Sequence, residues 1–127
     1  MSRVVFDASA ILTAAKNEPG TDLVFRHAQD SVVSTVNLAE AQAKLVQWGV
    51  SPDDAWQAAL SFCHQVVPFD SEQARLTGNL KSTTSPLGLS PGDRACLALA
   101  ILLRLPVYTS DRVWKKLQLG VEVRLLR

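Results

Sequence analysis

Short apolar runs rich in valine recur along the chain, and longer segments with helical character separate them. The runs are residues 3–6, 31–34, 66–69, 106–108 and 121–126. Apolar runs of this length are typical of strands that are buried on both faces of a sheet. Strands that alternate with helices imply parallel pairing, with helices packed on the two faces. The sequence therefore predicts an α/β fold with a parallel sheet covered by helices on both faces.

Several of the intervening segments carry helix signals. Helices are expected over residues 8–16, 22–28, 35–48 and 71–80. Gly49 ends the third of these, and Ser51 followed by Pro52 is the order typical of the start of a helix. A helix that continues to Cys63 would then form a helical hairpin with its predecessor.

The second half of the chain is expected to contain one buried helix. Residues 82–92 are rich in Ser, Thr, Gly and Pro and are predicted to form a loop. Asp93 is predicted to begin a helix that is apolar nearly all round, and such a helix is expected to be buried. A short helix is expected to follow Asp111 and to end near Leu117.

Length and composition favour one domain over residues 1–127. The chain has 47% apolar residues and a net charge of +1, which excludes a disordered chain. Its longest apolar run, residues 96–103, is far shorter than the roughly 20 residues that span a bilayer. Asp7 leaves no room for the apolar core of a signal peptide, so the protein is predicted to be cytoplasmic. Both cysteines are expected to be buried thiols.

Charge is unevenly distributed along the chain. Residues 1–72 contain four Lys or Arg against nine Asp or Glu, whereas residues 73–127 contain nine against three. A basic half is compatible with a phosphate-rich partner, although charge segregated in sequence need not be segregated in space. The sequence has no glycine-rich nucleotide loop of the GxGxxG or GKS/GKT type, which argues against a dinucleotide or P-loop site.

Four acidic residues occupy positions where a ligand site is expected. Asp7 and Asp111 follow strands directly, Asp93 begins a predicted helix, and Glu40 lies in the second turn of another. Ligands of open α/β sheets bind beyond the carboxyl ends of the strands. Two carboxylates about 5 Å apart repel by about 3 kcal/mol at an effective dielectric of 20, so a cluster requires a cation. Carboxylates without a His or Cys set suit Mg²⁺ or Mn²⁺, which activate water in phosphodiester cleavage.

Each acidic residue also has a simpler structural interpretation. Asp7 and Asp111 would cap helices, and Asp93 would complete a capping box with Ser90. Glu40 precedes Lys44 by four residues, the spacing of an ion pair on a helix surface. The sequence leaves both interpretations open for each residue.

Four segments together resemble the PIN-domain family, and within it the VapC-type ribonuclease toxins of toxin–antitoxin pairs. The segments are VVFDASAIL, STVNLAEA, LSPGDRACLALA and PVYTSD, in order across nearly the whole chain. The resemblance implies a PIN-like three-layer sandwich with a parallel five-stranded sheet. It also implies a catalytic Mg²⁺ or Mn²⁺ site, with hydroxyl groups in supporting positions. The metal ligands would be Asp7, Glu40, Asp93 and Asp111, and the supporting residues would be Ser9 and Thr109.

The predicted function is that of a metal-dependent endoribonuclease acting as a toxin. Its partners would be an RNA substrate (tRNA, rRNA or mRNA), a small antitoxin and a second copy of the chain. Basic residues near the acidic ones would contact RNA phosphates, or would simply form a solvated helix face. These residues are Arg94, Arg112, Lys115 and Lys116. The alternatives are a non-catalytic PIN-fold module that binds RNA or protein, and a PIN nuclease outside any toxin–antitoxin pair.

Overall fold

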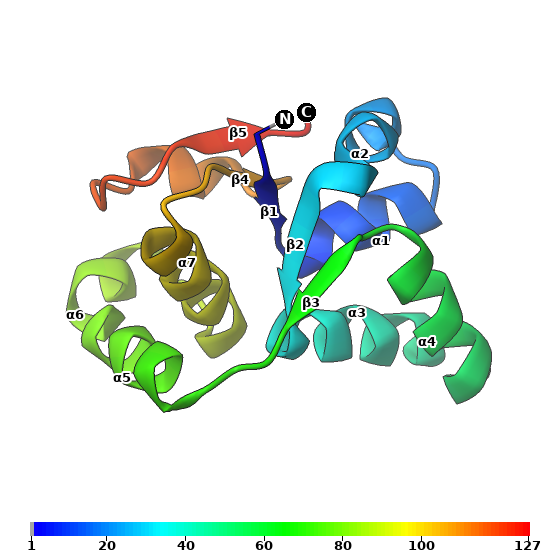
Figure 1. Cartoon of the computed structure of the whole chain (residues 1–127), viewed down its shortest axis with the longest axis horizontal. Coiled ribbons are helices and arrows are strands. Elements are labelled where there is room, and N and C mark those ends of the chain that lie inside the picture. Colours follow the sequence, from blue (N-terminus) through cyan, green and yellow to red (C-terminus); the bar gives the residue numbers. More distant parts are fainter. Residues whose placement is uncertain (1) are drawn as a thin grey trace.

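The computed structural model describes residues 2–127, and within them five parallel strands form one sheet (Figure 1). Its order is β3-β2-β1-β4-β5. The strands are β1 (Val4–Phe6), β2 (Ser31–Ser34), β3 (Gln65–Val67), β4 (Val107–Thr109) and β5 (Val123–Leu125). Every neighbouring pair is parallel. The predicted fold class is confirmed.

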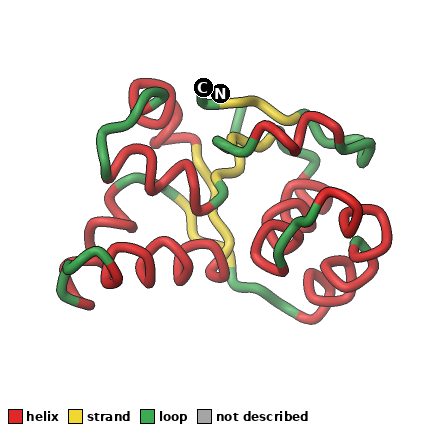
Figure 2. Tube along the Cα trace, turned by 180° about the vertical axis from the view of Figure 1, so that it is seen from behind, coloured by secondary structure: helices red, strands yellow, loops and turns green. Residues whose placement is uncertain are grey.

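Helices cover both faces of the sheet, as the two opposite views show (Figures 1 and 2). One layer contains α1 (Ala8–Ala15), α2 (Thr21–His27), α3 (Thr35–Gln47) and α4 (Pro52–Ser61). The other contains α5 (Ser71–Asn79), α6 (Lys81–Thr84) and α7 (Pro91–Leu103). Three 3₁₀ turns complete the described helices, namely η1 (Ala28–Asp30), η2 (Ser85–Leu87) and η3 (Arg112–Lys116). No helix among residues 2–127 is long and apolar enough to cross a membrane.

Alternate residues of the central strands face opposite helix layers. Val4 and Phe6 pack with residues of α1 and α2, whereas Val5 packs with residues of α7. In the next strand Val32 belongs to the α7 side and Val33 to the α3 side. All five side chains are at most 1% exposed. Burial on both faces explains why these runs show no polar alternation.

Helix α7 is the buried helix that the sequence predicts. Residues 95–100 are all buried, and they pack against the strands and Trp114. Cys96 lies in this segment as a free, buried thiol, and Cys63 is a free thiol that is partly buried.

The structure corrects three predicted boundaries. Residues 82–92 are not simply a loop, because α6 and η2 occupy most of the segment. Ser, Thr and Pro favour helix starts as well as turns, so composition alone does not separate the two. Helix α7 begins at Pro91 rather than Asp93, since Ser90 is its N-cap. Strand β3 ends before Pro68, which has no N–H group for the ladder.

Candidate functional site

The strand order places two of the predicted acidic residues at neighbouring strand ends. The chain runs from β1 outward to β2 and β3, and β4 then pairs with the opposite side of β1. Such a reversal creates a crevice at the carboxyl ends of the two central strands. Asp7 directly follows β1, and Asp111 lies two residues after the end of β4. The candidate site is therefore at the β1–β4 switch point.

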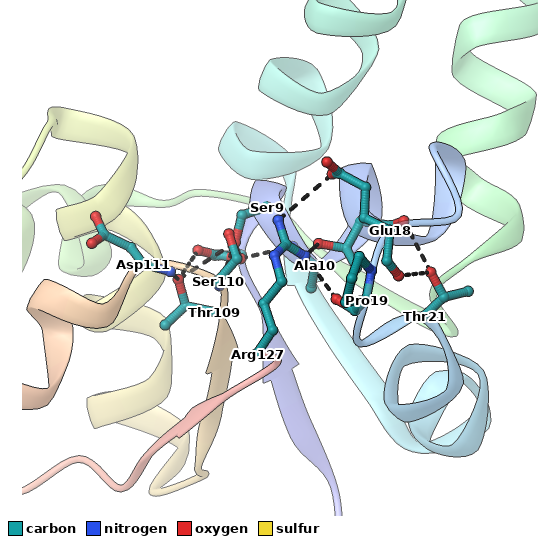
Figure 3. Close-up of polar contacts among 11 residues, drawn as sticks. Ser9, Ala10, Glu18, Pro19, Thr21, Thr109, Ser110, Asp111 and Arg127 are labelled. Atoms are coloured by element: carbon teal, nitrogen blue, oxygen red, sulfur yellow. Dashed lines mark hydrogen bonds and ion pairs between the residues drawn. The ribbon is translucent and has the colours of Figure 1, made fainter.

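Asp7 is fixed by three short hydrogen bonds. Ser9 Oγ donates to Asp7 Oδ1 at 2.6 Å, and Thr109 Oγ1 donates to Asp7 Oδ2 at 2.6 Å. The backbone N–H of Ala10 also donates to Oδ1, at 2.9 Å, so Asp7 caps α1. Figure 3 shows Ser9, Thr109 and Asp111 gathered where α1 begins and β4 ends. Both residues predicted to support the site thus contact the Asp7 carboxylate.

Burial dominates the electrostatics of Asp7. The side chain is only 4% exposed. Burial raises the pKa of Asp7 from 3.8 to about 6, although the hydrogen bonds from Ser9, Thr109 and Ala10 lower it. The negative charge of Asp93 raises it further. A cation placed beside this carboxylate would favour its charged form and would lower its pKa.

Glu40 of α3 lies against the first turn of α7, which contains Asp93. Asn37 Nδ2 donates to Glu40 Oε1 at 2.9 Å and to the backbone oxygen of Gly92 at 3.0 Å. A Cβ atom added to Gly92 would overlap the Glu40 carboxylate. Glu40 therefore lies against the backbone of Gly92, one residue before Asp93. It forms no ion pair with Lys44 among residues 2–127, so the surface-pair interpretation is wrong.

Three of the carboxylates act electrostatically on the buried thiol of Cys96. Burial raises the pKa of Cys96 well above its usual range, and the charges of Asp7, Asp93 and Glu40 raise it further. All three carboxylates therefore lie within electrostatic reach of one buried atom. Asp111 does not belong to this set.

The acidic side chains do not form a complete set of metal ligands in the described chain. Within residues 2–127, no three His, Cys, Asp or Glu side chains lie close enough together to hold a metal ion.

The capping interpretation holds for every predicted Asp. Asp93 Oδ2 accepts from Ser90 N at 3.0 Å, and Asp111 Oδ1 accepts from Val113 N at 3.0 Å. In the described chain, the second oxygen of each accepts no hydrogen bond, which leaves it available to a ligand.

The four predicted basic residues are held by different elements. Arg94 Nη1 donates to Thr77 O of α5 at 2.9 Å, which ties α7 to α5. Arg112 donates to the backbone oxygen of Arg127 at 3.3 Å, and Lys115 Nζ donates to Val123 O at 2.6 Å. Lys116 is exposed and lines a cavity of about 400 Å³ between η2 and η3. None of the four acidic residues lines this cavity, and Lys116 is the one basic residue of the four whose side chain makes no hydrogen bond within residues 2–127.

Sequence analysis missed three polar features near the acidic residues. Asn37 and Gly92 hold Glu40, and the Asn37–Glu40 spacing of three residues on one helix could have indicated a contact. Arg127 Nη1 donates to Thr13 Oγ1 and to Pro19 O, both at 2.9 Å. Figure 3 shows Arg127 reaching toward Glu18 and Pro19. No local pattern predicts this contact, because it joins residues more than 100 positions apart.

The fold is that of an α/β protein with acidic residues at the switch point of its parallel sheet. Residues 4–119 match the PIN domain family, and the chain belongs to that family. No curated protein matches the sequence.

Several solved structures share the whole fold at low sequence identity. The DNA-bound VapBC structure from Salmonella typhimurium has a chain with a TM-score of 0.76, 18% identity and full coverage of both chains. A chain of a toxin–antitoxin complex from Klebsiella pneumoniae has a TM-score of 0.75 and 16% sequence identity, with 98% of each chain covered. VapC20 of Mycobacterium tuberculosis, a toxin that cleaves the sarcin-ricin loop, has a TM-score of 0.74 and 13% sequence identity. That match covers 94% of this chain and 98% of VapC20. The structural neighbours therefore include VapC toxins.

Proposed function

We propose that this PIN domain is a metal-dependent endoribonuclease and the toxin of a toxin–antitoxin pair. The observation that carries the proposal is the buried Asp7 carboxylate at the switch point, with its pKa raised to about 6 and with Asp93 in electrostatic reach. Hydroxyl and amide groups bind Asp7, and no basic side chain bonds to it among residues 2–127. Negative charge concentrated without a counter-ion favours a bound cation.

The residues present suit a hard divalent cation. Carboxylate oxygens are the ligands that Mg²⁺ and Mn²⁺ prefer. Asn37 Oδ1, beside Glu40 on α3, is a buried acceptor that has no donor in the described chain. The holders of the ion would be Asp7, Glu40, Asp93 and Asp111. Such an ion would supply positive charge beside the substrate phosphate and would lower the pKa of the attacking water.

The chain's own residues would organise the hydrolysis. Ser9 and Thr109 hold the Asp7 carboxylate in one orientation through its two oxygens. In the proposed reaction a water oxygen bonds to phosphorus while the bond from phosphorus to the 3′ oxygen breaks. The leaving oxygen takes up a proton, so the products are a 5′-phosphate and a 3′-hydroxyl. Lys116 would contact a phosphate away from the bond that is cut.

The toxin assignment draws on the structural neighbours. One of them is a toxin–antitoxin complex and another belongs to the VapBC family of toxin–antitoxin systems, which supports a small antitoxin as a partner of this chain. Trp48 and Trp56 would either pack within the α3–α4 hairpin or contact a partner, and they are 43% and 37% exposed. Exposed aromatic side chains are common in protein interfaces, so they fit the second role. A nuclease activity is supported by VapC20, a toxin that cleaves the sarcin-ricin loop.

The first test measures whether the acidic residues bind a cation. Melting temperature would be recorded against Mn²⁺ and Mg²⁺ for the wild type, Asp93→Asn and Asp54→Asn. Asp54 is a matched control, because it is also the third residue of a helix whose N-cap is a serine followed by proline. An ion at ten times its dissociation constant stabilises the fold by about 1.4 kcal/mol, a rise of several degrees.

We expect the wild type and Asp54→Asn to respond and Asp93→Asn to lose most of the response. RNA cleavage should then require the metal and should be lost in Asp93→Asn. If no variant responds at millimolar metal, the proposal fails. The non-catalytic PIN-fold module then becomes the better explanation, and RNA binding that ignores a chelator would support it.

A further inference from the structure

Asn37 occupies a buried position between two of the acidic residues. Its side chain is 1% exposed, and Nδ2 donates to Glu40 Oε1 at 2.9 Å and to Gly92 O at 3.0 Å. Both partners are acceptors, which fixes the orientation of the amide, since a flipped Asn37 would place an oxygen against two oxygens. Asn37 therefore joins the carboxylate of α3 to the first turn of α7.

Gly92 is needed for the same contact. It is buried, and the space where a Cβ would lie is filled by the Glu40 carboxylate. Its φ angle is not positive, so the requirement for glycine comes from space rather than from backbone conformation. Gly78 offers a contrast, because nothing lies within 4 Å of its Cβ position on α5.

The amide of Asn37 has one atom that the described chain leaves unused. Asn37 Oδ1 is buried and accepts no hydrogen bond within residues 2–127. Leaving a buried acceptor unpaired costs about 1–3 kcal/mol. A polar partner of this oxygen would remove that cost.

We propose that Asn37 and Gly92 are positioning residues that hold the Glu40 carboxylate beside Asp93 for a divalent cation. This inference rests on the proposed function. In this proposal neither Asn37 nor Gly92 contacts the ion or the substrate. Asn37 acts through its two hydrogen bonds, and Gly92 acts by leaving the space that the carboxylate occupies. Groups that orient metal ligands in this way typically change metal affinity by about 10- to 100-fold when they are replaced.

The test compares two positioning variants with two matched controls. The dissociation constant for Mn²⁺ would be measured by electron paramagnetic resonance of the free ion, for the wild type, Asn37→Ala and Gly92→Ala. Gln73→Ala is the control for the first, because Gln73 is also a buried amide with an unpartnered oxygen. Gly78→Ala is the control for the second. Melting temperature without metal would be recorded for each protein.

We expect about a tenfold or larger increase in the Mn²⁺ dissociation constant for Asn37→Ala and Gly92→Ala, and little change for the controls. A purely structural role would lower the metal-free melting temperature and leave the dissociation constant of the folded protein unchanged, which would overturn the inference alone. If Asn37→Ala does not fold, Gly92→Ala decides the matter. Absence of Mn²⁺ binding by the wild type would overturn the proposed function, and this inference with it.

Discussion

Replacing Asp7 by Asn removes a carboxylate whose pKa burial raises from 3.8 to about 6. Between these values the folded protein carries a proton on Asp7 that the unfolded chain lacks. Unfolding then releases a proton, so raising the pH favours unfolding. The contribution of the protonated Asp7 to the free energy of unfolding is fully present below about pH 4 and is lost as the pH rises through 6. At 1.36 kcal/mol per pKa unit, the loss is about 3 kcal/mol.

Urea unfolding of the metal-free protein between pH 3 and pH 7 would measure this loss. Asp7→Asn should gain about 3 kcal/mol relative to the wild type over that range, or roughly 10 °C in melting temperature. Asp70→Asn is the control, because Asp70 caps α5 through the same type of bond but is exposed. A difference between Asp7→Asn and the wild type that stays constant with pH would refute the argument from burial.

Two further predictions follow from the geometry of the site. Thr109→Val removes a donor to the Asp7 carboxylate, so metal-free stability at pH 7 should fall by about 2 kcal/mol and by less at pH 4, as urea unfolding would show. An equal fall at both values would contradict a bond to the charged form. Lys116→Ala, placed in the inactive Asp93→Asn background, should reduce the salt dependence of RNA binding by about 0.7 in the log–log slope, measured by fluorescence anisotropy. An unchanged slope would remove Lys116 from the RNA contact.

The fold could be predicted from the sequence because its signals are local. Valine-rich runs and the apolar α7 segment each indicate burial without reference to the rest of the chain. Strand order could not be obtained in this way. Val5 pairs with Val32 and with Val107, and the order of helices and strands alone does not reveal these neighbours. The hydrogen bond from Thr109 to Asp7 depends on that order, since it joins residues 102 positions apart.

The tertiary contact of Glu40 could not be predicted from the sequence either. Its contact with Gly92 requires α3 and α7 to meet at one edge of the sheet, and no spacing within either helix encodes that meeting. The Lys44 spacing favours a surface pair instead, which the structure does not contain among residues 2–127. Tertiary packing overrides the local preference here, because an exposed pair of this type contributes only about 0.3–0.5 kcal/mol.

Capping and ligand binding are not alternatives for the three Asp residues. Asp7, Asp93 and Asp111 each cap a helix or helical turn, and because those elements begin at one edge of the sheet, capping itself gathers negative charge there. The caps therefore cannot decide whether the cluster has a function. Glu40 is informative because it caps no helix: it lies in the second turn of α3, where no free amide needs an acceptor. Its placement on Gly92, held by a buried Asn37, has no capping explanation, and the proposed cation site would explain it.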